Sequence, residues 1–199
     1  QLLAHASGLV DYTVTEAFLD QIRPSTKVVL PPRTLVDFVA GLPLLFPPGS
    51  QYAYSNTNAI VLGMIVEAAT SASFASQMAA RVTDPLRLHR TFLPDAPDLP
   101  RPRARGYLFP VRGAGTPRDV TRAYSPSLAW PTGSAVSTAL ETGRFLRARM
   151  AGRVFGPTLV ETSIAALRPG DSMPKGPGRN RAGLGIFEYR IPDCGTLDG

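Results

Sequence analysis

Residues 46–58 read FPPGSQYAYSNTN and lead directly into the apolar run AIVLGMIVEAA at residues 59–69. The two prolines and the glycine favour a turn. The apolar residues that follow recur with the spacing of one helix face. We therefore expect a loop that ends close to Asn56 and a helix that continues to about Ala69.

The tripeptide Tyr54-Ser55-Asn56 stands at the end of this loop. In an extended or turn-like segment, residues two apart point the same way, so Tyr54 and Asn56 are expected to face one cleft. A phenol can act as acid or base where neighbouring cations lower its pKa from about 10. An amide offers one acceptor and two donors for a substrate amide. A packed tyrosine beside an Asn56 or Ser55 N-cap is the alternative, and the tripeptide alone favours it.

The composition is that of an ordinary folded protein, with 199 residues of which 44% are hydrophobic. This length allows one good-sized core in one or two domains. The net charge of +6 comes mainly from arginine, and Arg101, Arg103 and Arg105 form the densest group. No nucleic-acid motif accompanies them, so we expect a solvated loop and no nucleic-acid partner. A weak attraction to anionic cell-surface polymers stays open.

Helix-start signals are frequent along the chain. Three Thr-x-x-Glu capping boxes begin at Thr13, Thr138 and Thr158. In the helix after Tyr54-Ser55-Asn56, four apolar residues are expected to face inward. These are Val61, Leu62, Ile65 and Val66. Further helices are expected from Thr34 to Gly41, over Phe74 to Val82 and from Ser137 to Met150.

Two stretches interrupt the helical pattern. The proline-rich residues 94–118 and the residues 169–182 are expected to be irregular loops. The segment GLGIFEYRI, within residues 183–199, has the pattern of a strand. The sequence therefore predicts a mainly helical part over residues 1–168, helix over about three quarters of the chain, and a strand that returns to a sheet near the end.

No metal or cofactor is expected. His5 and His89 lie far apart in the sequence, and no ligand-spaced cluster is present. The one Ser-x-x-Lys match, Ser172 to Lys175, lies among glycines and prolines that prevent a helix, so we interpret it as chance. Cys194 is the only cysteine, which leaves no partner for a disulfide within these residues.

Four stretches, in the same order, resemble the serine β-lactamase and penicillin-binding-protein superfamily. They are LLAHASGLVDYT at residues 2–13, FPPGSQYAYSNTNAIVLGMIVE at 46–67, DPLRLHRTF at 84–92 and GSAVSTALETGRF at 133–145. The second is the most specific. Its nearest branch in this resemblance is that of D-alanyl-D-alanine carboxypeptidases and class C β-lactamases. Ala6 and Arg87 depart from the family pattern, in positions where we expect no loss of fold.

The resemblance implies roles for individual residues. Tyr54 matches the catalytic tyrosine and Asn56 the substrate-binding asparagine of the family. Trp130 and Thr132 are expected to line the cleft wall as substrate contacts, although a core or surface position for Trp130 is an equal alternative. His5 and Ser7 are expected to brace a loop under the site.

The fold implied is α/β, of the serine β-lactamase and D-alanyl-D-alanine-peptidase type. Residues 1–199 would be an internal part of one such domain, mostly its helical portion with a first strand of the α/β portion. The Ser-x-x-Lys and His- or Lys-x-Gly motifs would lie before Gln1 and after Gly199. On this interpretation the 199 residues alone are inactive.

The function implied is acyl transfer through a covalent acyl-enzyme, with a peptidoglycan stem peptide or a β-lactam as partner. A class C β-lactamase, an esterase and a non-catalytic binding homologue of the same fold are the alternatives; a helical interaction module is a further one. The resemblance also implies a monomer outside the cytoplasm.

Overall fold

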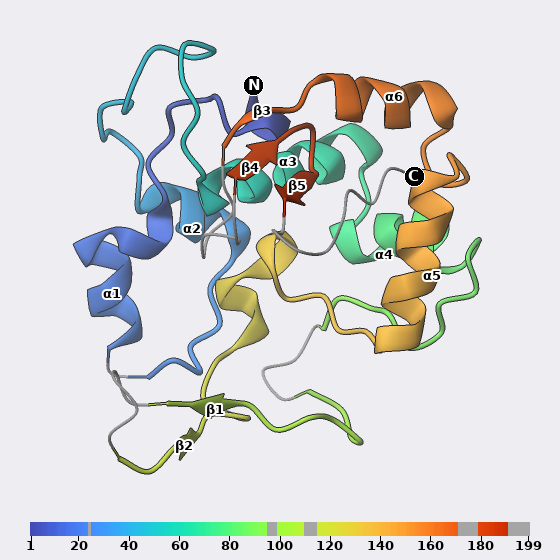
Figure 1. The fold of residues 1–199 in the computed structure, drawn as a ribbon. Coiled ribbons are helices and arrows are strands. Elements are labelled where there is room, and N and C mark those ends of the chain that lie inside the picture. The colour runs from blue at the N-terminus through green and yellow to red at the C-terminus, as the bar shows by residue number, and fades with distance from the viewer. Residues whose placement is uncertain (24, 95–98, 110–114, 171–178, 191–199) are drawn as a thin grey trace.

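The computed structural model describes residues 1–23, 25–94, 99–109, 115–170 and 179–190, and the account below concerns these residues (Figure 1). In this part of the chain, helices and two small sheets are joined by long loops. The Ser172–Lys175 motif and Cys194 lie outside the described residues.

The helical elements are short apart from α3 and α5. The α-helices are α1 Glu16–Ile22, α2 Pro32–Asp37, α3 Asn56–Thr70, α4 Phe74–Met78, α5 Ala139–Met150 and α6 Pro157–Ala165. The single turns are η1 Leu2–Ala4, η2 Tyr12–Val14, the π turn η3 Ala79–Thr83, η5 Pro126–Leu128 and η6 Trp130–Thr132.

The strands form two separate antiparallel sheets. The strands β1 Tyr107–Leu108 and β2 Arg118–Asp119 pair with each other, and the order β3-β4-β5 makes the second sheet. The strands of the second sheet are β3 Arg168–Pro169, β4 Arg179–Ala182 and β5 Phe187–Arg190.

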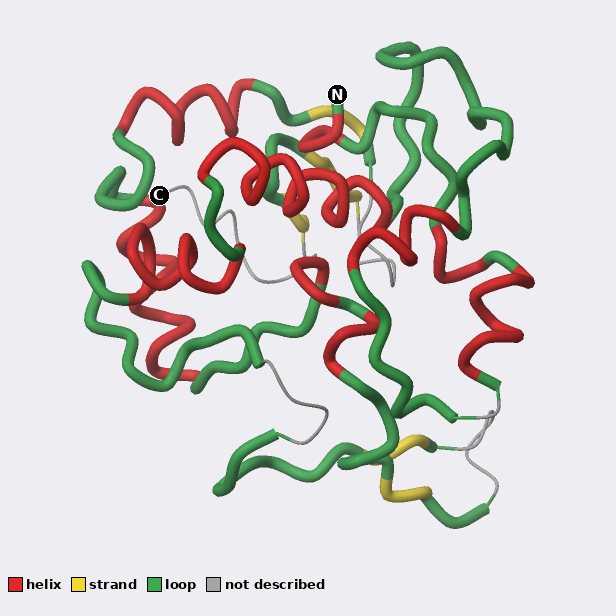
Figure 2. The backbone as a smooth tube through the Cα atoms, turned by 180° about the vertical axis from the view of Figure 1, so that it is seen from behind, coloured by secondary structure: helices red, strands yellow, loops and turns green. Residues whose placement is uncertain are grey.

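The helical content is lower than the sequence predicts. Figure 2 shows short helices separated by long loops, and helices cover fewer than half of the described residues. The expectation of three quarters is therefore wrong. Many of the helical elements are single turns or short helices rather than long helices.

Of the three capping boxes, one is confirmed. Thr138 is the N-cap of α5, and its hydroxyl accepts a hydrogen bond from the Glu141 backbone N–H at 3.3 Å. At the first box, Thr15 rather than Thr13 caps α1. At the third, Thr158 lies inside α6, which begins at Pro157. The N-cap residue is Gly156, which has no side chain to accept a hydrogen bond from the first turn.

Helix α3 crosses the middle of the molecule, and the core gathers around it (Figure 1). Ile60 of α3 is buried, whereas Ile65 is 51% exposed. The predicted inward face of α3 is therefore wrong at Ile65. The buried members of the core cluster are Tyr12, Phe18, Leu30, Leu35, Val39, Ile60 and Leu128.

A close approach at Gly63 explains this orientation of α3. A Cβ atom on Gly63 would lie 2.7 Å from the Trp130 ring and 2.9 Å from Pro131. The indole also meets Phe74 edge-on at 5.8 Å between ring centroids. The helix therefore turns its glycine, and not Ile65, toward the η6 turn.

The first residues pair with the loop that precedes α3. The Gly49 N–H donates to the Ala6 carbonyl at 2.7 Å, and the Leu45 N–H donates to the Gly8 carbonyl at 2.8 Å. Gly8 has φ +78°, and a side chain there would overlap the Phe46 carbonyl oxygen. This irregular ladder holds the two segments that the resemblance singled out against each other.

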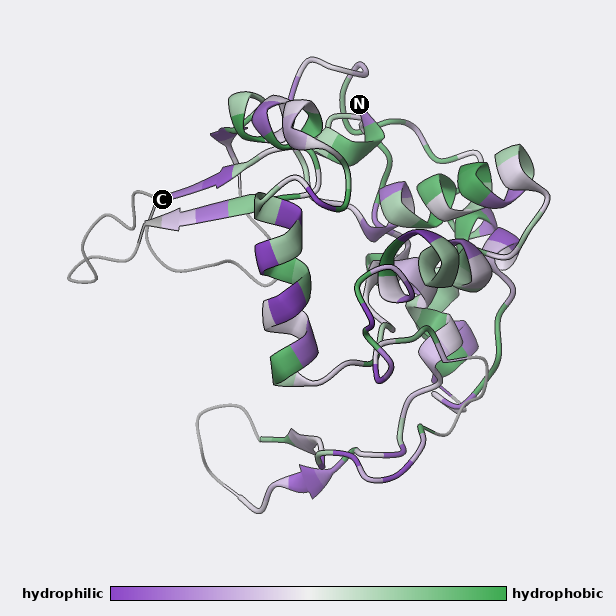
Figure 3. Ribbon diagram, turned by 90° about the vertical axis from the view of Figure 1, so that its right-hand side faces the viewer, coloured by the Kyte–Doolittle hydropathy of each residue, from purple (hydrophilic) through white to green (hydrophobic). Residues whose placement is uncertain are grey.

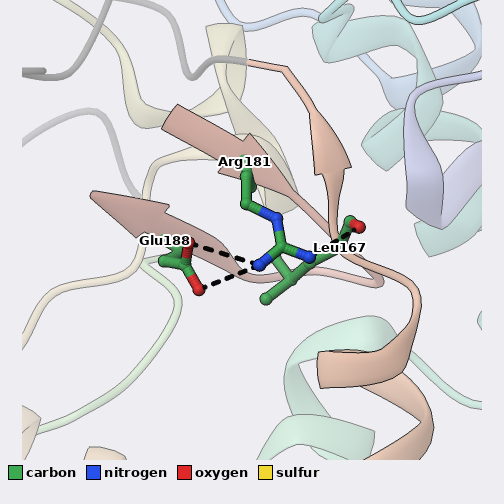
Figure 4. A network of polar contacts seen from close by, with 3 residues as sticks. All are labelled: Leu167, Arg181 and Glu188. Carbon is green, nitrogen blue, oxygen red and sulfur yellow. Dashed lines mark hydrogen bonds and ion pairs between the residues drawn. The ribbon is translucent and has the colours of Figure 1, made fainter. Parts of the chain in front are cut away.

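The predicted strand near the end is confirmed as β5, but the loop predicted over residues 169–182 is wrong for β4. Strand β4 pairs with β5 in the register Asn180↔Tyr189 and Ala182↔Phe187. Figure 4 shows a further link, in which Arg181 is paired with Glu188 at 3.4 Å and donates to the Leu167 carbonyl at 3.1 Å. Pairing with a partner strand, rather than local propensity, makes β4 a strand.

The proline-rich stretch 94–118 also contains more structure than predicted. Its β1 strand pairs with β2 through Tyr107↔Asp119 and Leu108↔Arg118. The hairpin lies at the far end of the molecule from α6 (Figure 1). Two-residue strands carry no alternation that a sequence pattern could reveal.

Helix α5 lies beside α6. It is amphipathic, and hydrophobic and hydrophilic residues alternate along it in Figure 3. Its Glu141 is buried and accepts hydrogen bonds from the Arg90 backbone N–H at 3.0 Å and the Thr91 hydroxyl at 2.6 Å. This acidic residue anchors α5 to the segment after η3.

No single helix among the described residues has both the length and the apolar character needed to cross a membrane. Residues Asn56–Thr70 and Phe74–Thr83 meet that test only as a pair bent by 83°.

Gly8→Ala is expected to destabilise the fold by about 2–4 kcal/mol, because the left-handed backbone disfavours a side chain and the added methyl group overlaps a backbone carbonyl. Urea unfolding followed by circular dichroism measures the change. Gly143→Ala is the control: nothing lies within 4 Å of a Cβ there, and alanine favours a helix interior. Equal stability of the two variants would contradict the ladder.

Candidate functional site

Tyr54 and Asn56 lie together where the loop enters α3. The Tyr54 hydroxyl donates to Asn56 Oδ1 at 3.3 Å, and both side chains are half-buried. The structure therefore places the phenol and the amide side by side, in the spacing that the sequence indicates. Ser55 between them is fully buried, and its hydroxyl donates to the Val10 carbonyl at 3.2 Å.

Asp11 binds the start of α3. Its Oδ2 atom accepts hydrogen bonds from the Asn56 backbone N–H at 3.0 Å and from Asn56 Nδ2 at 2.8 Å. Ser55 holds the N-cap position without making a side-chain cap. The carboxylate from a distant segment thus performs the capping for which the sequence suggested Asn56 or Ser55.

His5 lies flat against Tyr54, with ring centroids 4.5 Å apart and planes 24° from parallel. Its Nδ1 accepts the Ser55 backbone N–H at 3.2 Å. An acceptor nitrogen carries no proton, so the proton of the neutral ring is on Nε2. Burial lowers the pKa of His5, which favours this neutral form.

Asn58 links His5 to Ser7 one turn inside α3. Its Nδ2 lies 3.2 Å from His5 Nδ1, and its Oδ1 accepts the Ser7 hydroxyl at 2.6 Å. The predicted bracing role of His5 and Ser7 is therefore confirmed as a set of contacts beneath Tyr54.

Strand β5 adds aromatic rings beside both Tyr54 and His5. The Phe187 centroid lies 6.3 Å from that of Tyr54 and 6.4 Å from that of His5. Tyr189 stacks on Phe187 at 6.3 Å. These rings limit the water around Tyr54 and connect the site to the second sheet.

The surroundings raise the pKa of Tyr54, first through burial and then through the charges of Asp11 and Tyr189. In the described part of the chain, the charges that act on this phenol are negative, so Tyr54 keeps its proton at neutral pH. The protonated phenol can therefore donate a proton. To act as a base, Tyr54 would need a cation beside it that lowers its pKa.

Trp130 and Thr132 lie in the η6 turn, where they contact the protein itself. Trp130 packs on Gly63 of α3, and the Thr132 hydroxyl donates to the Ala129 carbonyl at 2.6 Å. The described residues bring neither side chain into a hydrogen bond with Tyr54 or Asn56. Their role as substrate contacts stays a prediction.

Three cavities in the described part of the chain are lined by residues between His89 and Thr138. One of about 610 Å³ is bordered by Arg101, Arg103, Arg105 and Arg122, and Tyr54 and Asn56 line none of the three. The arginine group thus borders a hollow, where the sequence suggested only a solvated loop. The chemistry-bearing residues lie elsewhere, on the surface beside β5.

Among the residues that the structure describes, no group of three or more His, Cys, Asp and Glu side chains is placed to hold a metal ion. The site consists of a phenol, an amide, a neutral imidazole and a carboxylate. Such a set can donate protons and grip an amide.

A family model described as Beta-lactamase matches residues 1–193. The chain belongs to the Beta-lactamase family. Its mixture of helices and small sheets is part of the α/β fold of that family, and the solved structures that it resembles include D-amino acid amidases and, in fold, a penicillin-binding protein. The family and fold predicted from the sequence are thus confirmed.

Three solved structures illustrate the relationship. A D-stereospecific amidohydrolase from Streptomyces sp. is 25% identical with a TM-score of 0.83, over 96% of this chain and 56% of that one. The D-amino acid amidase from Ochrobactrum anthropi SV3, complexed with L-phenylalanine amide, is 25% identical with a TM-score of 0.82, over 96% and 53%. A penicillin binding protein from Bacillus halodurans shares the fold, at 22% identity and a TM-score of 0.74, over 94% and 54%.

This Beta-lactamase-family chain therefore spans about half the length of the structures it matches. Within that half, sequence reasoning missed Asp11 and Asn58. The pattern Asp11-x-Thr13 is a local signal for a side chain that accepts from its own backbone two residues on. Nothing local signals that the same carboxylate reaches Asn56.

The buried, neutral His5 predicts that the stability of the fold depends on pH. Because the pKa of His5 is lowered on folding, the unfolded chain binds the proton more readily. The contribution of His5 to the free energy of unfolding is then complete above the unfolded pKa of about 6.5, and it is lost as the pH falls below that value. His5→Gln is expected to flatten the change in unfolding free energy between about pH 6.5 and 5.

Urea unfolding at each pH measures this slope, and His89→Gln at an exposed position is the control. An unchanged slope in His5→Gln would contradict the neutral, acceptor role of His5.

Proposed function

We propose that the protein containing this chain is a serine hydrolase of the D-alanyl-D-alanine carboxypeptidase type, acting through a covalent acyl-enzyme. The observation that supports this most is the Tyr54–Asn56 pair, held at the start of α3 by Asp11 and stacked on His5. A phenol and an amide held this firmly suit proton transfer and the grip of an amide substrate.

In the proposed reaction, a serine from sequence outside residues 1–199 attacks the carbonyl carbon between two D-alanines. Its proton passes through Tyr54 to the nitrogen of the departing D-alanine, and an ester forms between the serine and the acyl group. Water then attacks the ester and regenerates the serine. A lysine of the Ser-x-x-Lys motif would supply the cation that the described residues do not place beside Tyr54.

Asn56 would bind the amide next to the scissile bond. Its Nδ2 carries two hydrogens, of which one is directed to Asp11, so the other can donate to a substrate carbonyl. Trp130 and Thr132 remain proposed wall residues. The proposed surroundings are extracytoplasmic, with a peptidoglycan stem peptide or a β-lactam bound by a monomer.

A second candidate is a D-amino acid amidase, which the comparisons favour. Two of the three solved structures described above, each 25% identical to this chain, are called D-stereospecific amidohydrolase and D-amino acid amidase. The chemistry is the same until the leaving group departs as ammonia rather than as D-alanine. A class C β-lactamase and an esterase of this fold would also form an acyl-enzyme, and the rate at which that acyl-enzyme is hydrolysed separates them.

The first experiment uses the full-length protein and compares three substrates: a D-alanyl-D-alanine peptide, D-phenylalanine amide and penicillin. Release of D-alanine together with a persistent penicillin adduct in the intact mass supports the carboxypeptidase. Release of ammonia from the amide alone identifies the amidase, and rapid loss of penicillin with a transient adduct identifies a β-lactamase. No turnover and no adduct would overturn the hydrolase proposal.

Tyr54→Phe in the full-length protein is expected to slow acylation by roughly 100-fold or more, because a general acid–base group is lost while the ring packing stays. Stopped-flow or quenched mass measurements of the acylation rate test this. Tyr124→Phe is the matched control, at a half-exposed tyrosine outside the site. An unchanged rate in Tyr54→Phe would leave Tyr54 as a packing residue only.

A further inference from the structure

The carboxylate of Asp11 is buried at 7% exposure and is fully occupied by hydrogen bonds. Its Oδ1 accepts from the Thr13 backbone N–H at 2.9 Å and the Thr13 hydroxyl at 2.8 Å. Its Oδ2 accepts hydrogen bonds from the backbone N–H and from Nδ2 of Asn56. A buried charge is stable only when it is matched in this way, so Asp11 has one fixed orientation.

That orientation decides which way the Asn56 amide points. Asp11 Oδ2 is an acceptor, so the amide atom that faces it at 2.8 Å must be the donor Nδ2. The other end, Oδ1, then faces the Tyr54 hydroxyl at 3.3 Å. Without Asp11 the amide could turn over, because the last torsion of an asparagine side chain is broad and roughly two-fold.

The three side chains thus form a hydrogen-bonded chain in which each group donates to the next. The Tyr54 O–H donates to Asn56, and Asn56 donates to Asp11. The phenolic hydrogen is thereby directed toward Asn56, and one amide hydrogen is used internally. Only the second amide hydrogen is left for a ligand.

We propose that Asp11 is a positioning residue of the active site, whose carboxylate sets the direction of the Asn56 amide and, through it, the hydroxyl of Tyr54. This inference rests on the proposed function for its effect on rate. Its geometric part concerns this chain alone. Asp11 touches no substrate in the proposal and acts only through the two residues it orders.

The charge of Asp11 also reaches Tyr54. The titratable groups around the phenol are His5 stacked on it, Asp11 and Tyr12 on the η2 side, and Tyr189 on β5. Glu188 between the β5 aromatic residues is paired with Arg181. After burial, Asp11 is the largest cause that raises the pKa of Tyr54. Removal of its charge therefore lowers that pKa.

The test in the full-length protein is Asp11→Asn, which keeps the shape and removes the charge. Acylation by penicillin, or turnover of whichever substrate the wild type accepts, is expected to fall about 10- to 100-fold, the scale of a misplaced functional group. The limb of the pH profile that reports Tyr54 is expected to move to lower pH. A purely structural role would leave the profile where it is.

A double-mutant cycle separates positioning from simple destabilisation. If Asp11 acts through Asn56, Asp11→Asn has little further effect in an Asn56→Ala background. Additive effects would overturn the proposal. Asp20→Asn, which makes the same change at an exposed ion pair with Arg23, is the control and keeps wild-type rates.

A measurement without turnover tests the geometry by itself. In the ¹⁵N NMR spectrum of the full-length protein, the Asn56 side-chain amide, assigned by its absence in Asn56→Ala, is expected to exchange slowly with water. In Asp11→Asn it exchanges at least 10-fold faster. Fast exchange in the wild type overturns the positioning role, whereas a slow amide in a protein that acylates nothing overturns the proposed function alone.

Discussion

Helix α3 begins without a cap of its own, and the rest of the site depends on how that deficiency is met. Ser55 holds the cap position but donates its hydroxyl to a backbone carbonyl of the first segment. Two N–H groups of the first turn, those of Asn56 and Asn58, are bound instead by Asp11 and by the Ser55 carbonyl. A hydrogen bond to a charged group contributes about 1.5–3 kcal/mol, so this contact is strong enough to fix where the helix starts.

The same contact brings together two parts of the chain that are about 45 residues apart. The first segment supplies His5, Ser7 and Asp11, and the loop before α3 supplies Tyr54 and Asn56. Backbone hydrogen bonds between the segments keep them in register. The phenol is therefore held by the His5 imidazole and by Phe187 of β5, and it is linked through Asn56 to the Asp11 carboxylate. A functional side chain requires such rigidity.

The sequence predicted α3 closely, because a long apolar run with a loop signal in front is the strongest local pattern available. It also predicted β5 and the neighbourhood of Tyr54 and Asn56. Strand β4 was missed, since its residues RNRA have no strand pattern and form a strand only by pairing with β5. The orientation of α3 was wrong at Ile65 because the decisive contact is Gly63 against Trp130, a pair 67 positions apart in the numbering.

Asp11 could not have been assigned from the sequence for the same reason. Its local pattern explains the bonds to Thr13 but not those to Asn56. Side-chain partners that meet only through the fold leave no trace in spacing. The candidate site residues on a single short segment could therefore be proposed from the sequence, and the residues that hold them in place could not.

The distant capping of α3 links the order of folding to the formation of the site. A helix capped by its neighbour can form early and alone, whereas full capping of this first turn requires the segment around Asp11, and such long loop closures are slow. We therefore expect Tyr54 and Asn56 to become ordered together with the core around Tyr12 and Ile60. On this expectation, the local order of Asn56 reports on whether the two distant segments have come together.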